Sequence, residues 1–156
     1  MAYQRWGRGD RVQVFLPPLV SNLDIMWELP EQEALYRRAG RALDLITFDK
    51  RGTGLSDRIS EPVTFETHAA DLITILDVEQ VHQAGLVGFS EGGIVALVTA
   101  ALYPERVTSV VTQGTPVMGT DYASLLALAD PDNLPPSPDE QVDRYRSMIR
   151  GWATPE

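Results

Sequence analysis

Cysteine is absent from the 156-residue chain, and histidine occurs only twice, as His68 and His82. Without cysteine, neither a disulfide framework nor a thiolate metal site is possible, and two separate histidines form no ligand cluster. We therefore expect no metal and no cofactor. Basic runs are also scarce, since the longest is the pair Arg37-Arg38 and the formal net charge is -9. Such a chain repels a phosphate backbone, which excludes nucleic acid as a partner.

Long hydrophobic runs are missing too. The longest, from Ile94 to Ala101, is far shorter than the roughly 20 residues that cross a bilayer, and the first ten residues carry no apolar signal-peptide core. We therefore expect a soluble, cytoplasmic protein that does not bind membranes. With a hydrophobic content of 44%, the chain can still bury one sizeable core, and its length suits one domain or part of one.

Strand-like runs alternate with helical patterns through most of the chain. A β-rich or apolar run predicts strands at 11–16, 43–48, 83–87 and 107–112, and apolar spacing predicts helices at 29–40, 65–76 and 92–103. Gly40 marks the end of the first helix, and Thr64 is the expected N-cap of the second. The third is apolar nearly all round, so we expect it to be buried. This alternation predicts an α/β fold, with a mostly parallel sheet and helices on both faces.

The chemistry is concentrated between the third strand and the third helix. Residues 88–92 read Gly-Phe-Ser-Glu-Gly, which fits the pattern G-x-S-x-G in its required strand–turn–helix context. In so tight a turn Ser90 adopts a strained backbone, while Gly88 and Gly92 let the strand and helix approach each other. The helix N-terminus then offers N–H groups to a developing oxyanion, and the Glu91 N–H is one predicted donor.

With this motif, residues 2 to about 118 resemble the α/β-hydrolase superfamily. The segments "ITFDKRGTGLSD" (46–57) and "YPERV" (103–107) are also typical of that family. The resemblance implies that "FLPPLVSN" (15–22) occupies the place of the oxyanion loop, with the Leu19 N–H as second donor and Pro17-Pro18 in place of the usual His-Gly pair. The combination of WELPE, FDKRGTGLSDR and GFSEGG further resembles hydrolase-like domains that, in actinobacteria, often precede nucleotide-cyclase or regulator modules.

The partners that a serine nucleophile needs are not evident. In this superfamily the acid and then the histidine follow the serine, yet no histidine follows Ser90. His82 precedes its strand and His68 borders the apolar stripe of a helix, so neither is expected to act. Asp121 is only a nominal acid, because an acid without an imidazole to orient has no task.

The resemblance therefore predicts a chain that is incomplete at its C-terminus. Residues 1–118 would form the N-terminal part of the hydrolase core, and 119–156 a connector followed by the start of a cap region. The strand at 107–112 would then have a bare edge, which predicts self-association. We expect this truncated chain to be inactive apart from a small residual rate.

Several other charged and aromatic residues are expected to have structural rather than catalytic roles. Asp49 and Arg51 are expected to hold the loop after the second predicted strand, and Glu91 to point away from the oxyanion or to pair with an arginine. Trp27 and Trp152 are expected to serve packing.

Three functions remain open. The first is a serine hydrolase of the esterase or lipase kind that acts on a small-molecule ester through Ser90. The second is a hydrolase-derived sensory module that binds an apolar ligand without turnover. The third is a catalytically dead product.

Overall fold

A computed structural model of the chain describes residues 1–60 and 63–116. All described helices and strands belong to one compact unit, Met1–Thr115. The predicted connector and cap region, with Asp121 and Trp152, lie outside the described residues.

Five strands form one sheet in the order β1-β3-β2-β4-β5. The sheet is parallel except for β1, which pairs antiparallel with β3. The strands are β1 (Tyr3–Gly7), β2 (Val12–Leu16), β3 (Asp44–Phe48), β4 (Ala84–Phe89) and β5 (Val107–Gln113). The four predicted strands are confirmed, whereas β1 was not predicted.

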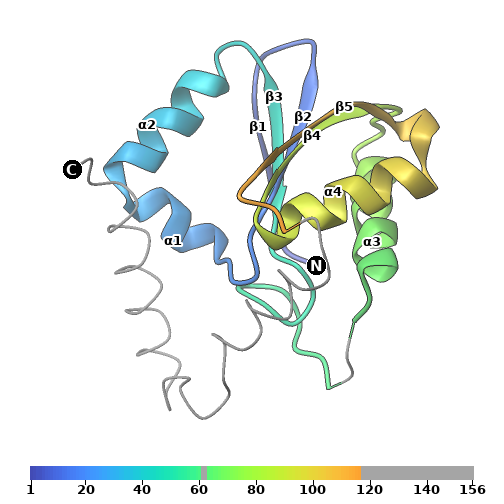
Figure 1. The fold of residues 1–156 in the computed structure, drawn as a ribbon. Coiled ribbons are helices and arrows are strands. Elements are labelled where there is room, and N and C mark those ends of the chain that lie inside the picture. The colour runs from blue at the N-terminus through green and yellow to red at the C-terminus, as the bar shows by residue number, and fades with distance from the viewer. Residues whose placement is uncertain (61–62, 117–156) are drawn as a thin grey trace. The chain divides into compact units, whose positions relative to one another are not determined.

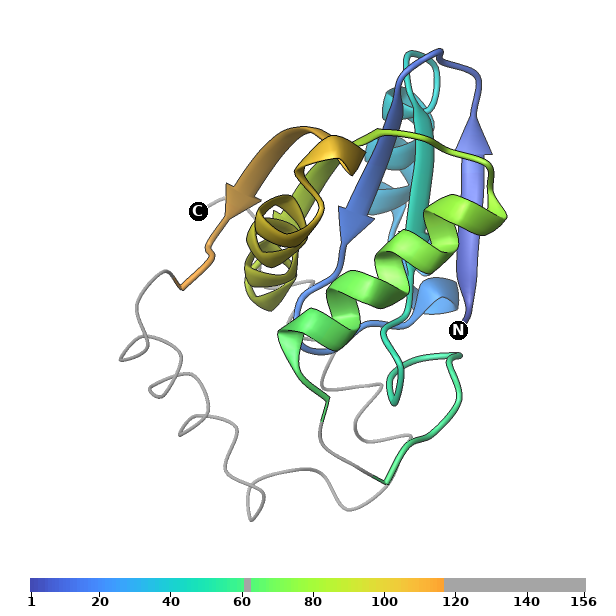
Figure 2. The same cartoon turned by 90° about the vertical axis from the view of Figure 1, so that its right-hand side faces the viewer.

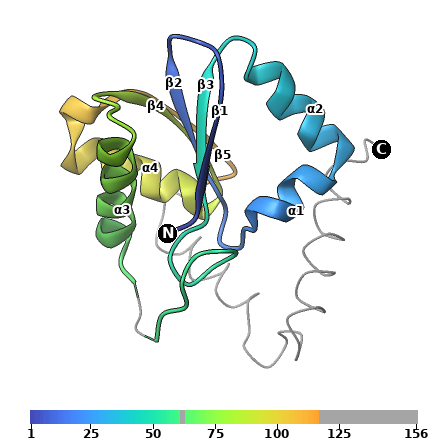
Figure 3. The ribbon, with the colours of Figure 1, turned by 180° about the vertical axis from the view of Figure 1, so that it is seen from behind.

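Helices cover both faces of the sheet, as the alternation predicts. Helices α1 (Leu23–Glu28) and α2 (Pro30–Ala39) lie on one face, and α3 (Phe65–Val78) and α4 (Glu91–Leu102) lie on the other (Figures 1, 2 and 3). A short 3-10 turn, η1 (Pro104–Arg106), precedes β5. Thr64 caps α3 through its hydroxyl, which accepts from the Thr67 N–H at 3.2 Å.

The region predicted as one helix at 29–40 is α2, and the short α1 before it was not predicted. Leu29 separates the two because a residue that precedes proline avoids the helical region, and Leu29 is extended at φ -94 and ψ 113. Gly40 ends α2 in a right-handed conformation, with φ -67, so the end of this helix does not use the left-handed freedom of glycine.

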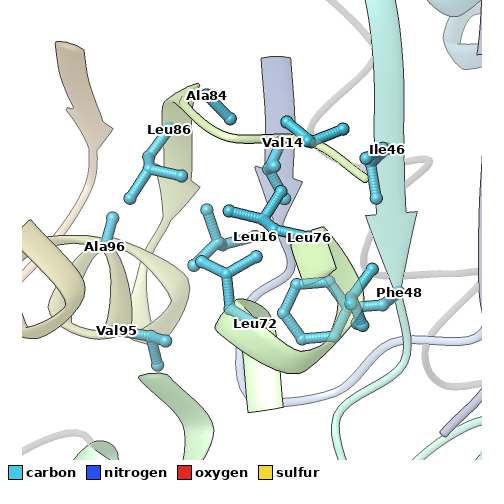
Figure 4. Close-up of a cluster of buried hydrophobic side chains, with 12 residues drawn as sticks. Val14, Leu16, Ile46, Phe48, Leu72, Leu76, Ala84, Leu86, Val95 and Ala96 are labelled. Carbon is cyan, nitrogen blue, oxygen red and sulfur yellow. The ribbon is translucent and has the colours of Figure 1, made fainter. Parts of the chain in front are cut away.

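The main core lies between the sheet and the α3/α4 layer. Alternate side chains of the strands point into it, since successive residues of a strand face opposite sides. Figure 4 shows how these strand residues meet α3 and α4: Val14, Leu16, Ile46, Phe48, Ala84 and Leu86 from the sheet, with Leu72, Leu76, Val95 and Ala96 from the helices.

One expectation for α4 is wrong. Its apolar composition predicts complete burial, yet Leu97 is 44% exposed and Leu102 is 51% exposed. The helix buries the face that carries Val95, Ala96 and Thr99. The face that carries Leu97 and Leu102 remains partly exposed to solvent.

Candidate active site at the start of helix α4

Ser90 makes a sharp turn between β4 and α4. The strand ends at Phe89 and the helix begins at Glu91, so one residue reverses the chain. Its backbone angles, φ 51 and ψ -120, lie outside the regions that residues with a side chain usually occupy. Strain of this kind costs about 1–3 kcal/mol and is concentrated at functional sites. The Ser90 N–H donates to the Gln113 carbonyl at 2.9 Å, which ties the turn to the end of β5.

Three glycines make this turn possible. A Cβ atom at Gly88 would overlap the backbone of Gly92 and Gly93, and one at Gly93 would overlap the side chain of Thr115. A Cβ atom at Gly92 would overlap the carbonyl oxygens of Leu16 and Pro17. Gly88 and Gly92 thus lie where strand, helix and loop approach most closely, and Gly93 adds a third such position.

The contact at Gly92 also places the loop after β2. Because the carbonyls of Leu16 and Pro17 lie against the first turn of α4, the segment that contains Leu19 begins beside the Ser90 turn. The two residues proposed from sequence as oxyanion donors, Glu91 and Leu19, therefore belong to segments that meet. Leu19 itself is exposed.

The side chain of Glu91 is buried and forms an ion pair with Lys50. Glu91 is 7% exposed and Lys50 only 2% exposed. The sequence-based expectation that Glu91 points away or pairs with an arginine is therefore wrong in its partner, which is a lysine from the loop after β3. Burial lowers the pKa of Lys50, while the charge and hydrogen bond of Glu91 act in the opposite direction.

Asp49 and Arg51 hold the same loop, as predicted. The Asp49 carboxylate accepts from Ser21 Oγ at 2.7 Å, from the Leu23 N–H at 3.1 Å and from the Leu55 N–H at 2.9 Å. Arg51 pairs with Asp71 of α3 and donates from Nε to Asp71 Oδ2 at 2.7 Å. The loop is thus fixed to the start of α1 and to α3, and this positions Lys50, the residue between Asp49 and Arg51.

The two histidines occupy very different places. His82 is exposed and lies before β4, whereas Ser90 follows it; a strand rises about 3.3 Å per residue, so β4 separates them by about 20 Å. His68 was expected at a boundary, but it is buried on α3, and its Nδ1 has no hydrogen-bond partner in the described structure. Burial lowers the pKa of His68, and Lys50 lowers it further against the opposing charges of Glu91 and Asp71.

This burial predicts an acid-sensitive fold. As the pH falls below about 6.5, the ordinary histidine pKa, the unfolded chain takes up a proton before folded His68 does. The free energy of unfolding should therefore decrease with falling pH until folded His68 also becomes protonated. Urea unfolding between pH 5 and pH 8 measures this slope, which His68→Gln should reduce. His82→Gln, at an exposed site, should leave the slope unchanged, and an equal effect of both substitutions would contradict the assignment.

A separate hollow is lined by residues of β1 and of helices α1 and α2, and part of its lining lies at the end of the sheet opposite Ser90. It has a volume of about 800 Å³ and is lined by Gln4, Trp6, Gly7, Arg8, Trp27, Arg37, Gly40 and Arg41. Gly7 is paired with Asp44, the first residue of β3, whereas Ser90 follows the last residue of the parallel strand β4. Trp27 packs edge-on against Trp6 and Tyr36, which confirms its packing role.

Within residues 1–60 and 63–116, no three acidic, histidine or cysteine side chains gather where they could hold a metal ion. No helix in the same part of the chain is long and apolar enough to cross a membrane.

Comparison with known proteins identifies the family to which this fold belongs. The family profile of the alpha/beta hydrolase fold matches residues 14–146. The protein named serine hydrolase BPHL from Mus musculus is 32% identical over 115 residues, which cover 72% of this chain and 38% of that protein. The 3-oxoadipate enol-lactonase 2 of Acinetobacter baylyi is 32% identical over 114 residues, 72% of this chain and 40% of the enzyme. The solved structure of a hydrolase from Pseudomonas aeruginosa superposes with a TM-score of 0.70 at 22% identity, covering 94% of this chain and 61% of its own.

The mostly parallel sheet between two layers of helices defines an α/β protein. Its candidate site is the sharp turn at Ser90 between β4 and α4. The chain belongs to the alpha/beta hydrolase fold family. It spans about two fifths of the length of the two curated relatives.

Proposed function

We propose that Ser90 is the nucleophile of an acyl-transfer reaction on a small-molecule ester or a related apolar acyl compound. The observation that carries the proposal is the strained backbone of Ser90 at the first turn of α4. A helix N-terminus leaves N–H groups without partners inside the helix and carries partial positive charge. Both properties suit the oxyanion that forms when a serine attacks a carbonyl carbon.

In this mechanism the Ser90 oxygen attacks the carbonyl carbon and its proton leaves to a base. The Glu91 and Leu19 N–H groups hold the oxyanion, the alcohol departs, and water then releases the acid from the acyl-serine. No histidine follows Ser90 in these 156 residues, and His82 lies at the far end of β4. The chain alone should therefore be nearly inactive, because no described imidazole can take the Ser90 proton, and the slow rate that depends on Ser90 should come from its unassisted hydroxyl.

Hydrolysis of short aryl esters tests this proposal. We expect slow release of p-nitrophenol from p-nitrophenyl acetate and butyrate, proportional to protein concentration and lost in Ser90→Ala. Ser60→Ala, at an exposed loop position, is the matched control and should keep the rate. Equal rates in the unaltered chain and in Ser90→Ala would contradict the proposed role. Saturable binding of an ester without turnover in any variant would instead favour the sensory-module alternative.

We also propose that the chain associates with itself through β5. Among the described residues β5 pairs only with β4, and its sequence VTSVVTQ contains no charged residue. Natural edge strands usually carry charges or proline that prevent pairing with another chain. In a twofold antiparallel pairing centred on Val110, Glu105 would face Thr115 of the second copy, so no like charges would oppose each other.

Sedimentation velocity at increasing concentration tests this association. Val111 is 56% exposed on β5, and Leu35 is 56% exposed on α2. Val111→Lys should weaken self-association at least tenfold because it places a charge on the edge strand, whereas Leu35→Lys should leave it unchanged. A monomer at all concentrations, or equal effects of the two substitutions, would contradict the proposal.

A further inference from the structure

The Lys50–Glu91 ion pair lies immediately beside the proposed nucleophile. Glu91 follows Ser90 directly and is the first residue of α4, so its carboxylate and its backbone N–H belong to the same helix N-terminus. The side chains of both partners are nearly inaccessible to solvent, at 3% exposure for Lys50 and 9% for Glu91. A charge in such a place is weakly screened and acts strongly on its surroundings.

An uncompensated carboxylate at this position would oppose an oxyanion. The N-terminus of a helix favours negative charge, but a second negative charge beside the first raises the energy of both. Three other ionisable groups among the described residues lie in this region, namely Arg51, Asp71 and His68. Arg51 is paired with Asp71, and His68 has a lowered pKa that keeps it neutral near pH 7. Among the described residues, Lys50 is the cation that forms an ion pair with Glu91.

We propose that Lys50 is a positioning residue, whose buried ammonium neutralises the Glu91 carboxylate so that the N-terminus of α4 can hold an anion formed on Ser90. This role rests on the proposed function of Ser90. Lys50 reaches the site because Asp49 and Arg51, its neighbours in sequence, fix the loop to α1 and α3. It acts through Glu91 and need not touch the substrate.

Binding of phenylboronic acid measures this effect without requiring turnover. The Ser90 oxygen forms a bond to boron, the hydroxyl proton leaves to solvent, and the trigonal boronic acid becomes a tetrahedral anion. Its charge lies where the reaction would place an oxyanion. Calorimetry and boron NMR at pH 7 give the dissociation constant, and Ser90→Ala should abolish the tetrahedral signal.

Four variants separate the charge of Lys50 from its packing. Lys50→Met should weaken boronate binding at least tenfold, and Lys50→Arg should retain most of the affinity because it keeps the cation. Glu91→Gln should bind the boronate at least as tightly as the unaltered chain, since it removes the negative charge beside the boronate. The double variant Lys50→Met/Glu91→Gln should recover most of the lost affinity. Glu91→Gln tests the proposal independently, even if Lys50→Met fails to fold.

A general loss of stability is distinguished by Val81→Ala, which removes buried core atoms between α3 and β4 and should leave boronate affinity unchanged. Equal affinities in the unaltered chain and Lys50→Met would overturn the inference, as would weaker binding by Glu91→Gln. Equally weak binding by Lys50→Met and the double variant would assign Lys50 to packing alone. If even the unaltered chain forms no tetrahedral boronate, the proposed function of Ser90 fails, and the role of Lys50 fails with it.

Discussion

Replacing Asp49 with alanine should lower the free energy of unfolding by about 4 kcal/mol. Asp49 is fully buried, and its carboxylate accepts from Ser21 Oγ and from the backbone N–H groups of Leu23 and Leu55. Alanine leaves these donors without their acceptor, and a buried unsatisfied donor costs about 1–3 kcal/mol. The effect should be large because one side chain joins the end of β3, the following loop and the start of α1.

Urea unfolding monitored by circular dichroism measures this loss. Asp57→Ala is the matched control, because Asp57 lies in the same loop with an exposed side chain, and its substitution should change stability by no more than about 0.5 kcal/mol. Asp49→Asn should fall between the two, since an amide oxygen preserves part of the acceptor capacity. A loss below about 1 kcal/mol for Asp49→Ala would show that the loop is held by other contacts.

Gly92→Ala should have the second large effect, with a loss of about 3 kcal/mol. The added methyl group would overlap the carbonyl oxygens of Leu16 and Pro17, which are backbone atoms and cannot move aside by a change of rotamer. Overpacking typically costs about 1–3 kcal/mol, and contact with backbone favours the upper end. The loop that contains Leu19 should be displaced as well, so any reactivity of Ser90 should fall together with stability.

The control for Gly92→Ala is the same substitution at Gly114. Gly114 has φ +61, but a Cβ atom there meets nothing within 4 Å. Its replacement should cost only the roughly 1–2 kcal/mol of a left-handed conformation, and it should leave the first turn of α4 intact. If thermal or urea unfolding showed the larger loss at Gly114, the close approach at Gly92 would not be what constrains the turn.

The sequence predicted those parts of the fold that depend on local pattern. Strands β2 to β5 are apolar or β-branched runs, and α3 has a strong helical period, so each can be recognised alone. β1 was missed because Tyr3–Gly7 contains polar residues and is defined by its pairing with β3. α1 has only six residues, which is too short for a helical period to be seen.

The candidate site also contains residues that a local motif identifies and residues that only the fold brings together. Ser90, Gly88 and Gly92 are neighbours in sequence, and a motif with fixed spacing can identify them. The Lys50–Glu91 pair joins residues 41 positions apart, and only the fold brings them together. A signal was nevertheless present, because Glu91 begins a largely apolar helix, and Lys50 lies two residues after a buried strand. His68 was misplaced for a similar reason, since two of the charged residues that act on it, Lys50 and Glu91, come from other elements.

The central claim is that Ser90 is a nucleophile, and covalent labelling with a fluorophosphonate probe tests it most directly. The fluorophosphonate reacts with a nucleophilic serine, fluoride leaves, and a stable phosphonyl ester remains on the serine. Mass spectrometry of the digested protein locates this adduct. The account predicts slow labelling at Ser90 that is absent in Ser90→Ala and unchanged in Ser60→Ala. An unlabelled chain, or an adduct that persists in Ser90→Ala, would contradict it.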